Sequence, residues 1–424
     1  MQTLRWVNLA IGILFAVCYS YQLFYIPVSW LSERIMTGRK KGVVGLHNYA
    51  ILICARNEEK VIRDLIDSIH EQTYPQEHLT IFVMADNCTD RTAEVSREAG
   101  AIVYTRSNSV LVGKGYALDK LLKHIHEDYP KAFDAYLVFD ADNVLDENYM
   151  MEMNRCFSEG NELITSYRNS KNYGSNWISA GYALWFLRES RYLNQARFAL
   201  GASSGISGTG FLFSAAIEEE LGGWPFHMLT EDIEFTMNQI TAGRKIAFCR
   251  TAELYDEQPI RFSQSWHQRM RWARGYWQVL RGYGKSMLWG MFHGNFSCYD
   301  MTMNIAPAFI LSVIGIFCNL ALGIWGATIG DDIMIAVQSL GQTLFNLVGL
   351  LFVVGLVTTI SEWKHIHTTT VKKLLYVFTF PIYMATYLPI AVASIFHDPS
   401  WKPIEHTISM RDAKNSGLLK SRAS

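Results

Sequence analysis

The apolar residues of this chain gather near its two ends and leave a long, more polar stretch between them, which limits its possible folds more than any other feature. Residues 4–31 contain no acidic side chain. A helix over this segment is long enough to cross roughly 30 Å of hydrocarbon, because each residue advances it by about 1.5 Å. The segment ends in Tyr, Trp and Pro residues and lacks a small-residue cleavage site, so we expect a retained membrane span, not a signal peptide.

Three further apolar stretches lie near the C-terminus, over residues 303–327, 334–360 and 374–396. A short turn with Asp331 and Asp332 separates the first two, which predicts a tight hairpin with its acidic turn outside the cell. The last stretch contains two prolines and precedes a basic tail. A third crossing would leave this tail outside, against the charge rule, whereas a re-entrant or interfacial segment keeps it in the cytoplasm, as we expect.

Basic residues also set the orientation of the chain. Four of them follow the first apolar segment, at positions 34, 39, 40 and 41, and only Arg5 precedes it. Positive charge favours the cytoplasmic side, so the sequence predicts a multi-pass protein of the cell membrane with a cytoplasmic central domain. The predicted units are a membrane helix, that domain, amphipathic interface helices, a C-terminal region of two or three spans and a basic tail, over residues 1–33, 44–260, 261–300, 301–397 and 398–424.

The central domain has short β-branched and aromatic runs that alternate with helical patterns, which is typical of an α/β fold with a mostly parallel sheet. The predicted strands span residues 49–54, 80–84, 101–104 and 135–139. Polar residues follow each of them. Because ligands of open α/β sheets bind beyond the carboxyl ends of the strands, we expect a ligand site in these loops.

The first loops at this edge carry three polar candidates. Asn57 follows the first predicted strand, and an N-cap of the next helix is its favoured interpretation. Asp86 and Asp90 follow the second strand. We expect Asp90 to cap the following helix, and Asp86 to accept hydrogen bonds from a uracil or a ribose.

Lys114 stands between two glycines at the predicted start of a helix. Free N–H groups and an ammonium meet at such a position, which suits a diphosphate. A solvated loop lysine is the alternative. The segment is no P-loop, because the first glycine and the Ser or Thr after the lysine are missing.

Asp140 and Asp142 come directly after the last predicted strand. In an extended chain, residues two apart point the same way, so both carboxylates can face one divalent cation. Mg²⁺ or Mn²⁺ prefers such oxygen ligands and would neutralise charge on a departing diphosphate. An Asp-x-Asp pair is weak by itself, and its position at the end of a buried strand strengthens it.

Two later motifs complete the candidate site. Thr230-Glu231-Asp232 opens a helical pattern with Thr230 as its apparent cap. One interpretation is that the helix dipole stabilises these acids in the first turn, and the other is that Asp232 is a general base. Gln268, Arg271 and Trp272 share one helix face, where the arginine can bind phosphate and the indole can stack on a sugar. An aromatic, basic helix lying on the membrane is the alternative, and both can hold together.

Charge and cysteine content exclude other classes of protein. The formal net charge of −1 gives no basic field of the kind that a nucleic-acid-binding protein needs, so no nucleic acid is expected among the partners. The seven cysteines form no Cys-x-x-Cys pair, which argues against a zinc site and fits reduced thiols.

These motifs, in this order, resemble those of the processive glycosyltransferases of family 2, the synthases of cellulose, hyaluronan, chitin oligosaccharides and poly-N-acetylglucosamine. The resemblance covers about residues 44–280 and implies a GT-A fold that inverts configuration while transferring a sugar from a UDP-sugar to a growing chain. It makes Asp232 the base, Asp142 the metal ligand and Asp86, Lys114, Asp140, Gln268 and Arg271 the donor contacts. Trp272 and the loop Gly208-Thr209-Gly210 would meet the acceptor.

The function predicted from this resemblance is polymerisation of a β-linked polysaccharide from a UDP-sugar with coupled export, using Mg²⁺ or Mn²⁺. Its partners would be the donor, a growing glycan, membrane lipids and a small accessory export subunit. A non-processive enzyme that adds one sugar to a lipid is the alternative, against which the Gln-x-x-Arg-Trp helix speaks. An inactive scaffold is disfavoured by the four carboxylates at 86, 140, 142 and 232. Residues 401–407 resemble a gating segment in position, although they lack its Thr-Arg pair.

Overall fold

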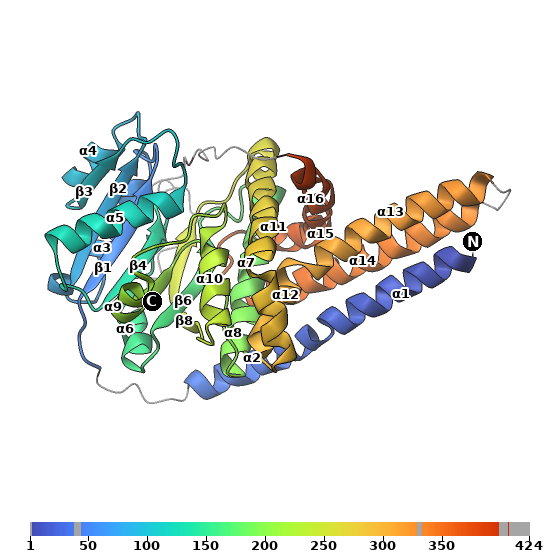
Figure 1. Cartoon of the computed structure of the whole chain (residues 1–424), viewed down its shortest axis with the longest axis horizontal. Coiled ribbons are helices and arrows are strands. Elements are labelled where there is room, and N and C mark those ends of the chain that lie inside the picture. Colours follow the sequence, from blue (N-terminus) through green and yellow to red (C-terminus); the bar gives the residue numbers. More distant parts are fainter. Residues whose placement is uncertain (1, 38–43, 329–332, 398–405, 407–424) are drawn as a thin grey trace.

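The computed structural model describes residues 2–37, 44–328, 333–397 and 406, and it has two visibly different parts (Figure 1). A rounded α/β domain holds the sheet. A long rod of helices projects from it, with the N-terminus at the far end. The predicted acidic turn at 331–332, and the tail apart from His406, lie outside the described residues.

The sheet contains eight strands in the order β3-β2-β1-β4-β7-β6-β8-β5. Its first four strands confirm the four predicted from the sequence to within two residues at each end. The strands are β1 Tyr49–Ala55, β2 Leu79–Asp86, β3 Ile102–Arg106, β4 Ala135–Asp140, β5 Val144–Leu145, β6 Leu163–Ser170, β7 Phe211–Ser214 and β8 Ala247–Asp256.

The prediction of a mostly parallel sheet holds for one half of it. Strands β1 to β4 pair in parallel, as do β6 and β8. Strand β7 is antiparallel to both β4 and β6. β7 has only four residues, and it leads directly from the glycine loop at 208–210 into the next helix. The sheet is therefore mixed, and this reversal brings the glycine loop beside the end of β4.

Alternate residues of the strands feed two hydrophobic cores, one on each face, because side chains of a strand alternate between faces. Tyr49, Ile51 and Ile53 enter the first core, while Ala50 and Leu52 enter the second. Helices α3 Ile62–His70, α4 Thr92–Glu98 and α6 Tyr149–Ser158 contribute to the first, and α5 Lys114–Asp128, α9 Ala215–Leu221 and α10 Glu231–Thr241 to the second. Both cores hold the strand ends in place from opposite sides.

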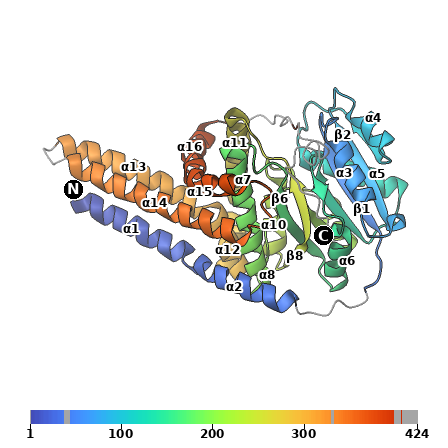
Figure 2. The ribbon, with the colours of Figure 1, turned by 180° about the vertical axis from the view of Figure 1, so that it is seen from behind.

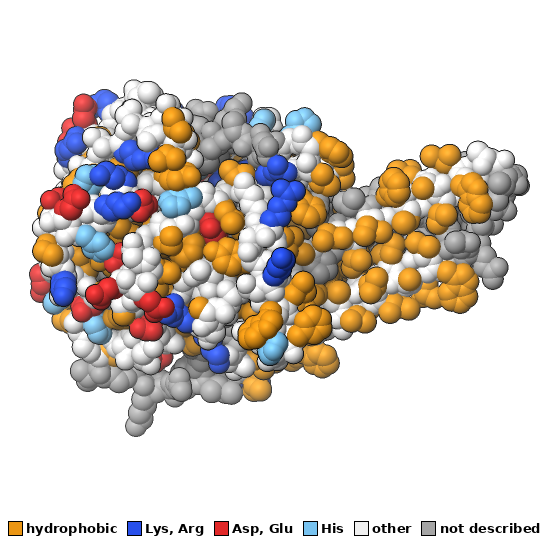
Figure 3. Space-filling model, in the orientation of Figure 1, with side chains coloured by type: hydrophobic (Ala, Val, Ile, Leu, Met, Phe, Trp, Pro, Cys, Tyr) orange, Lys and Arg blue, Asp and Glu red, His pale blue; other side chains and the backbone are white. Residues whose placement is uncertain are grey.

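The rod consists of α1 Gln2–Tyr19, α13 Pro307–Thr328 and α14 Ile333–Ser361 (Figures 1 and 2). Large apolar side chains such as Val17, Phe317 and Phe345 are exposed along it, and apolar atoms cover it in Figure 3. Exposed apolar surface of this extent marks a surface that contacts a membrane or another protein. Among the described residues, three segments are long and apolar enough to cross a membrane: Trp6–Arg34, Leu344–Ser361 and Thr370–Phe396.

The first of these segments is bent, because Ser20 separates α1 from α2 Tyr21–Thr37. The last divides into α15 Thr370–Ala385 and α16 Tyr387–Phe396, which lie off the end of the rod beside the α/β domain (Figures 1 and 2). Whether this last segment crosses the membrane, re-enters it or lies at its surface stays a prediction. The stretch predicted over 303–327 corresponds mainly to α13, which contacts α1 and α14.

Four helices join the two parts: α7 Trp177–Arg188, α8 Gln195–Ala199, α11 Phe262–Phe292 and α12 Phe296–Ile305, with the π-helix η2 Glu189–Asn194 between α7 and α8. A fully buried ion pair fixes this joint. Arg197 Nε donates to Asp300 Oδ2 at 2.6 Å, and the hydroxyls of Tyr21 and Tyr25 donate to the same carboxylate at 2.5 and 2.9 Å. Lysine and arginine side chains gather over the region of α11 in Figure 3. Arg281 and Lys285 of this helix are exposed.

Candidate active site

A cavity of about 900 Å³ opens where the carboxyl ends of β1, β2 and β4 meet α7, α11 and the membrane segments. This is the edge of the sheet at which the sequence predicted a ligand site. Most of the predicted site residues line it, namely Asp86, Lys114, Asp140, Asp142, Gly208, Asp232, Gln268, Arg271 and Trp272. Motifs that lie far apart in the sequence thus share one space.

Lys114 and Asp140 form the central ion pair of this space. The ammonium lies 2.5 Å from Asp140 Oδ1 and donates to the carbonyl of Gly208 at 2.7 Å. Burial alone would lower the pKa of Lys114, but the carboxylates of Asp140 and Glu231 outweigh it and raise the pKa. The lysine is therefore a fixed cation at the start of α5, not the solvated loop residue of the alternative interpretation.

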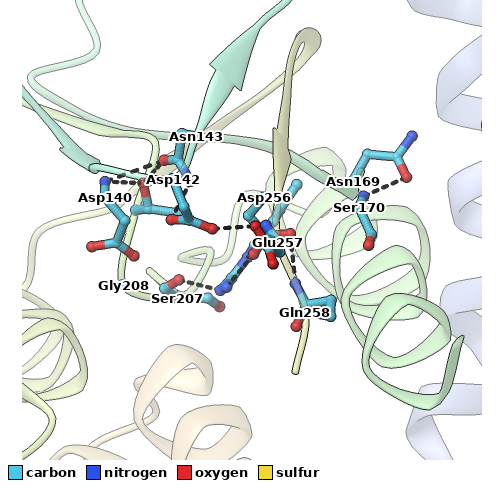
Figure 4. A network of polar contacts seen from close by, with 12 residues as sticks. Asp140, Asp142, Asn143, Asn169, Ser170, Ser207, Gly208, Asp256, Glu257 and Gln258 are labelled. Atoms are coloured by element: carbon cyan, nitrogen blue, oxygen red, sulfur yellow. Dashed lines mark hydrogen bonds and ion pairs between the residues drawn. The ribbon is translucent and has the colours of Figure 1, made fainter. Parts of the chain in front are cut away.

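Asp142 is held from a different direction. Its Oδ2 accepts a hydrogen bond from the backbone N–H of Glu257 at 2.7 Å (Figure 4). Burial favours protonation, but nearby cations, His406 and Lys171 first, hold the pKa of Asp142 below its usual value. The strand ends at Asp140, so the extended-chain argument for two parallel carboxylates does not apply, although both side chains line the cavity.

The carboxylates of the cavity suit a divalent cation that brings further ligands with it. No three His, Cys, Asp or Glu side chains converge on a metal position in the part of the chain that the structure describes. Two carboxylates, Asp140 and Asp142, do line the same cavity, and Asp140 is 38% exposed. Because Mg²⁺ is commonly held by one or two carboxylates together with substrate phosphates and water, this pair fits a cation that arrives with a diphosphate.

An arginine that no sequence motif singled out ties the two sides of the site together. Arg168 Nε donates to Asp256 Oδ2 at 2.6 Å, and its Nη1 donates to the carbonyl of Ser207 at 2.7 Å. Gln258 Nε2 donates to the other oxygen of Asp256 at 2.6 Å (Figure 4). Arg168 is in β6, a strand not predicted, so no sequence signal pointed to it.

The glycine loop borders both groups of carboxylates. Gly208 adopts a φ of +81°, and a Cβ there would lie 3.8 Å from Asp232 Oδ2 and 3.9 Å from Asp140 Oδ2. Thr209 and Gly210 lie behind the cavity wall instead: the hydroxyl of Thr209 accepts from the backbone N–H of Asp140 at 3.0 Å. Gly208 alone of the three lines the cavity, so an acceptor contact by the other two stays a prediction.

Glu231 and Asp232 begin α10 and reach the same space. Burial raises the pKa of Asp232, and burial together with the charge of Asp232 raises that of Glu231 to about 7. Thr230 stands at the N-cap position as predicted, but its side chain makes no capping bond. Its buried hydroxyl has no hydrogen-bond partner among the described residues. The cap expected from the sequence is thus present in position only.

Helix α11 carries Gln268, Arg271 and Trp272 and packs against the start of α10. Gly275 packs so closely that a Cβ would lie 2.5 Å from the side chain of Thr230. Arg271, one turn earlier, donates to the carbonyl of Leu229 at 3.2 Å. Trp272 packs edge-on against Tyr182 and Phe186 and still lines the cavity. The Gln268 Oε1 atom is buried and, within the described ranges, lacks a hydrogen-bond partner.

Hydrogen bonds join the loop after β1 to the loop after β2. Asp86 is buried at the end of β2, where Arg106 Nη1 donates to it at 2.5 Å. Asp90 accepts from the N–H of Thr92, the first residue of α4, but Arg91 holds the N-cap position and no side chain caps the helix, so the cap predicted at Asp90 is wrong. The capping role expected for Asn57 is wrong: it has a φ of +60° and its side chain accepts from the N–H of Thr89 in the neighbouring loop.

His406, the one described residue of the tail, also lines the cavity. Its Nδ1 lies 2.9 Å from Glu58 Oε2. Burial works against protonation, yet Asp142, Glu58 and Glu257 outweigh it and raise the pKa of His406 to about 10. The other residues of the predicted gating segment at 401–407 lie outside the described residues, so its gating role stays a prediction.

The chain was compared with known proteins. The family described as "Glycosyltransferase like family 2" matches residues 47–275. The probable glycosyltransferase YdaM of Bacillus subtilis is 25% identical over 316 residues, which cover 69% of this chain and 72% of the relative. Beta-monoglucosyldiacylglycerol synthase of Nostoc sp. is 26% identical over 63% of this chain and 57% of that protein.

One further sequence relative and one solved structure are also similar to this chain. Poly-beta-1,6-N-acetyl-D-glucosamine synthase of Staphylococcus epidermidis is 25% identical over 54% of this chain, so the chain spans only 55% of that relative's length. Among solved structures, the mannosyltransferase PcManGT of Pyrobaculum calidifontis, in complex with GDP-Man and Mn²⁺, matches with a TM-score of 0.56 over 92% of this chain and 99% of the other. At 15% identity this match shows the fold, which is of the GT-A type.

Proposed function

The chain belongs to the glycosyltransferase-like family 2, and from that premise we propose that it transfers a hexose from a UDP-sugar to an acceptor hydroxyl at a membrane, with inversion at the anomeric carbon. The arrangement around Gly208 carries the proposal. The proposed base Asp232 and the proposed donor contact Asp140 both border this one residue, and Lys114 binds its carbonyl. An acceptor and a donor sugar can therefore meet above it.

The reaction needs a base on the acceptor side. Asp232 takes the proton of the acceptor hydroxyl while that oxygen forms a bond to the anomeric carbon, and the bond from this carbon to the UDP oxygen breaks. The raised pKa of Asp232 brings the group closer to the working pH, where a general base is most effective. The relatives named as synthases of glucosyldiacylglycerol and of poly-N-acetylglucosamine support transfer of a hexose.

Cationic side chains would hold the departing nucleotide. Burial raises the pKa values of Glu231 and Asp232, and the nearby charges of Lys114 and Arg271 offset part of this rise. Positive charge is therefore concentrated here. Asp86, buried at the end of β2, would receive the uridine. Mg²⁺ or Mn²⁺, held by Asp142 with a contribution from Asp140, would supply charge neutralisation for the diphosphate.

The sequence leaves two kinds of sugar acceptor open. A growing β-linked polysaccharide with coupled export is the one that the Gln-x-x-Arg-Trp helix favours, and Trp272 lines the cavity as a sugar-stacking residue would. A single lipid hydroxyl is the other. The active-site carboxylates all line one cavity, which supports an enzyme over an inactive scaffold.

Release of UDP tests the proposal. Purified full-length protein in nanodiscs should release UDP from one member of a panel of UDP-sugars when Mg²⁺ or Mn²⁺ is present, and lose this activity on addition of EDTA. Asp142→Asn should fall by at least about 100-fold, since several kcal/mol of charge stabilisation are lost. Asp67→Asn, half-exposed on α3, is the matched control. Equal UDP release by both variants would exclude the proposed metal site, whereas no release from any donor by the unaltered protein would favour the scaffold.

A further inference from the structure

The cavity does not end at the carboxylates. All three segments that are candidates for membrane spans contribute to its wall, which therefore continues from the charged site into the membrane region. The first segment supplies Leu23 and Ile26, and the last supplies Leu388 and Ala391. A site reached from the hydrocarbon layer is open to molecules that dissolve there.

Helix α14 forms a purely aliphatic part of this wall. Its lining residues are spaced at helical intervals and consist of Leu347, Leu350, Leu351, Val353, Val354 and Val357. The next lining residue, Thr358, uses its hydroxyl on the carbonyl of Val354 in its own helix, at 2.8 Å. Six successive lining side chains thus offer a passing molecule no hydrogen bond.

A sugar chain and a lipid would experience this wall differently. Every sugar ring carries several hydroxyls, and each hydroxyl buried without a partner costs free energy. Hydrocarbon chains carry no hydroxyl and have no such cost. The α14 wall consequently favours an occupant with acyl or prenyl chains over a polysaccharide in transit.

An aromatic layer adjoins the aliphatic wall. Leu351 and Val354 pack into the same cluster as Trp185, Trp272 and Tyr387. Amphipathic rings of this kind sit at the level of lipid head groups, with their polar atoms towards water. The order of chemistry in the cavity is therefore charged, aromatic and aliphatic, which is the order met along an amphiphile from its head group to its chains.

We propose that the acceptor is a membrane lipid, whose chains occupy the aliphatic part of the cavity along α14 and whose head-group hydroxyl reaches Asp232. This inference rests on the proposed function. In the transfer, the lipid oxygen gains the bond to the anomeric carbon, its proton passes to Asp232, and UDP leaves with the electron pair of the broken bond. The product is a glycolipid that can return to the bilayer along the same wall.

The test fills the aliphatic part and follows where the sugar goes. Full-length protein in nanodiscs made from the expression host's own lipids receives radiolabelled UDP-sugars, and the products are divided into a chloroform-soluble fraction and an ethanol-insoluble aqueous fraction. Val354→Trp places an indole in the cavity. Val348→Trp, which is exposed on the same helix and is not a lining residue, is the matched control.

The expected result is label in the chloroform-soluble fraction, reduced at least tenfold in Val354→Trp and kept in Val348→Trp. Titration with UDP reports whether the donor end of each variant is folded, and Val357→Phe repeats the test about one turn along α14. Label found only in the aqueous polymer, or equal labelling of lipid by all variants, would overturn the lipid acceptor and leave the transferase intact. If no UDP-sugar gives labelled product or free UDP, the proposed function itself fails.

Discussion

The charged end of the cavity and its aliphatic end differ in how their side chains are held. At the charged end, Lys114 binds Asp140, Arg168 binds Asp256, and a backbone N–H binds Asp142. Along α14, the six aliphatic lining side chains have only van der Waals neighbours. Removing one member of an ion pair leaves its partner unpaired in a buried place, whereas shortening an aliphatic side chain leaves only space. Substitutions at the two ends should therefore differ in size and in what they affect.

The largest effect is expected from Asp232→Asn. The amide cannot accept the hydroxyl proton, and loss of a general base typically costs between about 100-fold and 10,000-fold in rate. Product formation should fall by this factor while UDP affinity changes little. Glu234→Gln is the control, since this acid lies two residues further on α10 and bonds the N–H of Met228 away from the cavity. A variant Asp232→Asn that keeps more than a tenth of the rate would place the base elsewhere.

A smaller loss is expected from Lys114→Met. The substitution removes the cation, leaves the half-buried Asp140 without it, and frees the Gly208 carbonyl. Hydrogen bonds to charged groups contribute about 1.5–3 kcal/mol, so the KM for the UDP-sugar should rise by roughly 10-fold to 100-fold. Lys123→Met, on the exposed side of the same helix, should leave KM unchanged. An unchanged KM in both variants would remove Lys114 from the donor site.

Glu231→Gln should change the pH dependence more than the maximal rate. Burial and the charge of the ionised Asp232 raise the pKa of Glu231 to about 7, so Glu231 gains its charge only after Asp232 has ionised. The variant removes this titration and leaves that of Asp232 in place. A step near pH 7 in the profile of kcat/KM against pH should therefore disappear, while the acidic limb stays where it is. A step near pH 7 that persists in the variant would belong to another group.

The smallest effect is expected at the aliphatic end, from Leu351→Ala. The variant widens the aliphatic part of the cavity, where the lipid chains are proposed to lie, without removing a polar contact. Packing against one methylene is worth at most about 0.8 kcal/mol, or about fourfold, so the relative use of lipids that differ by one methylene should shift by less than about tenfold, with donor KM constant. Competition between labelled short-chain and long-chain lipids measures it. A change in donor KM instead would mean that the two ends are not separable.

Much of this architecture follows from local sequence patterns. The strands β1 to β4, the start of α5 at Lys114 and the shared face of Gln268 and Arg271 all depend on periodicity or on glycine placement, which a single sequence displays. Because the loops after parallel strands open at one edge of a sheet, the residues that follow β1, β2 and β4 could be assigned to a common site from their sequence positions alone.

Contacts between distant segments could not be placed in this way. Asp142 accepts from the N–H of Glu257, 115 residues later, and Arg168 reaches Asp256, 88 residues later. Asn57 stabilises a neighbouring loop because its backbone turns into the left-handed region, which no capping pattern indicates. Hydropathy marks α14 as a candidate membrane span but does not show which of its faces borders the cavity.

The joint at Asp300 has a mechanical consequence. Tyr21 and Tyr25 of the N-terminal candidate membrane segment bond Asp300, which pairs with Arg197, and Glu33 of the same segment pairs with Arg191 and Arg250, so the segment cannot swing freely about the domain. In a protein whose apolar rod spans a bilayer, a bilayer thicker or thinner than the rod must then tilt the entire molecule, at a cost of a fraction of a kcal/mol per ångström. The height of the catalytic mouth above the lipid head groups becomes a property of the membrane as much as of the enzyme.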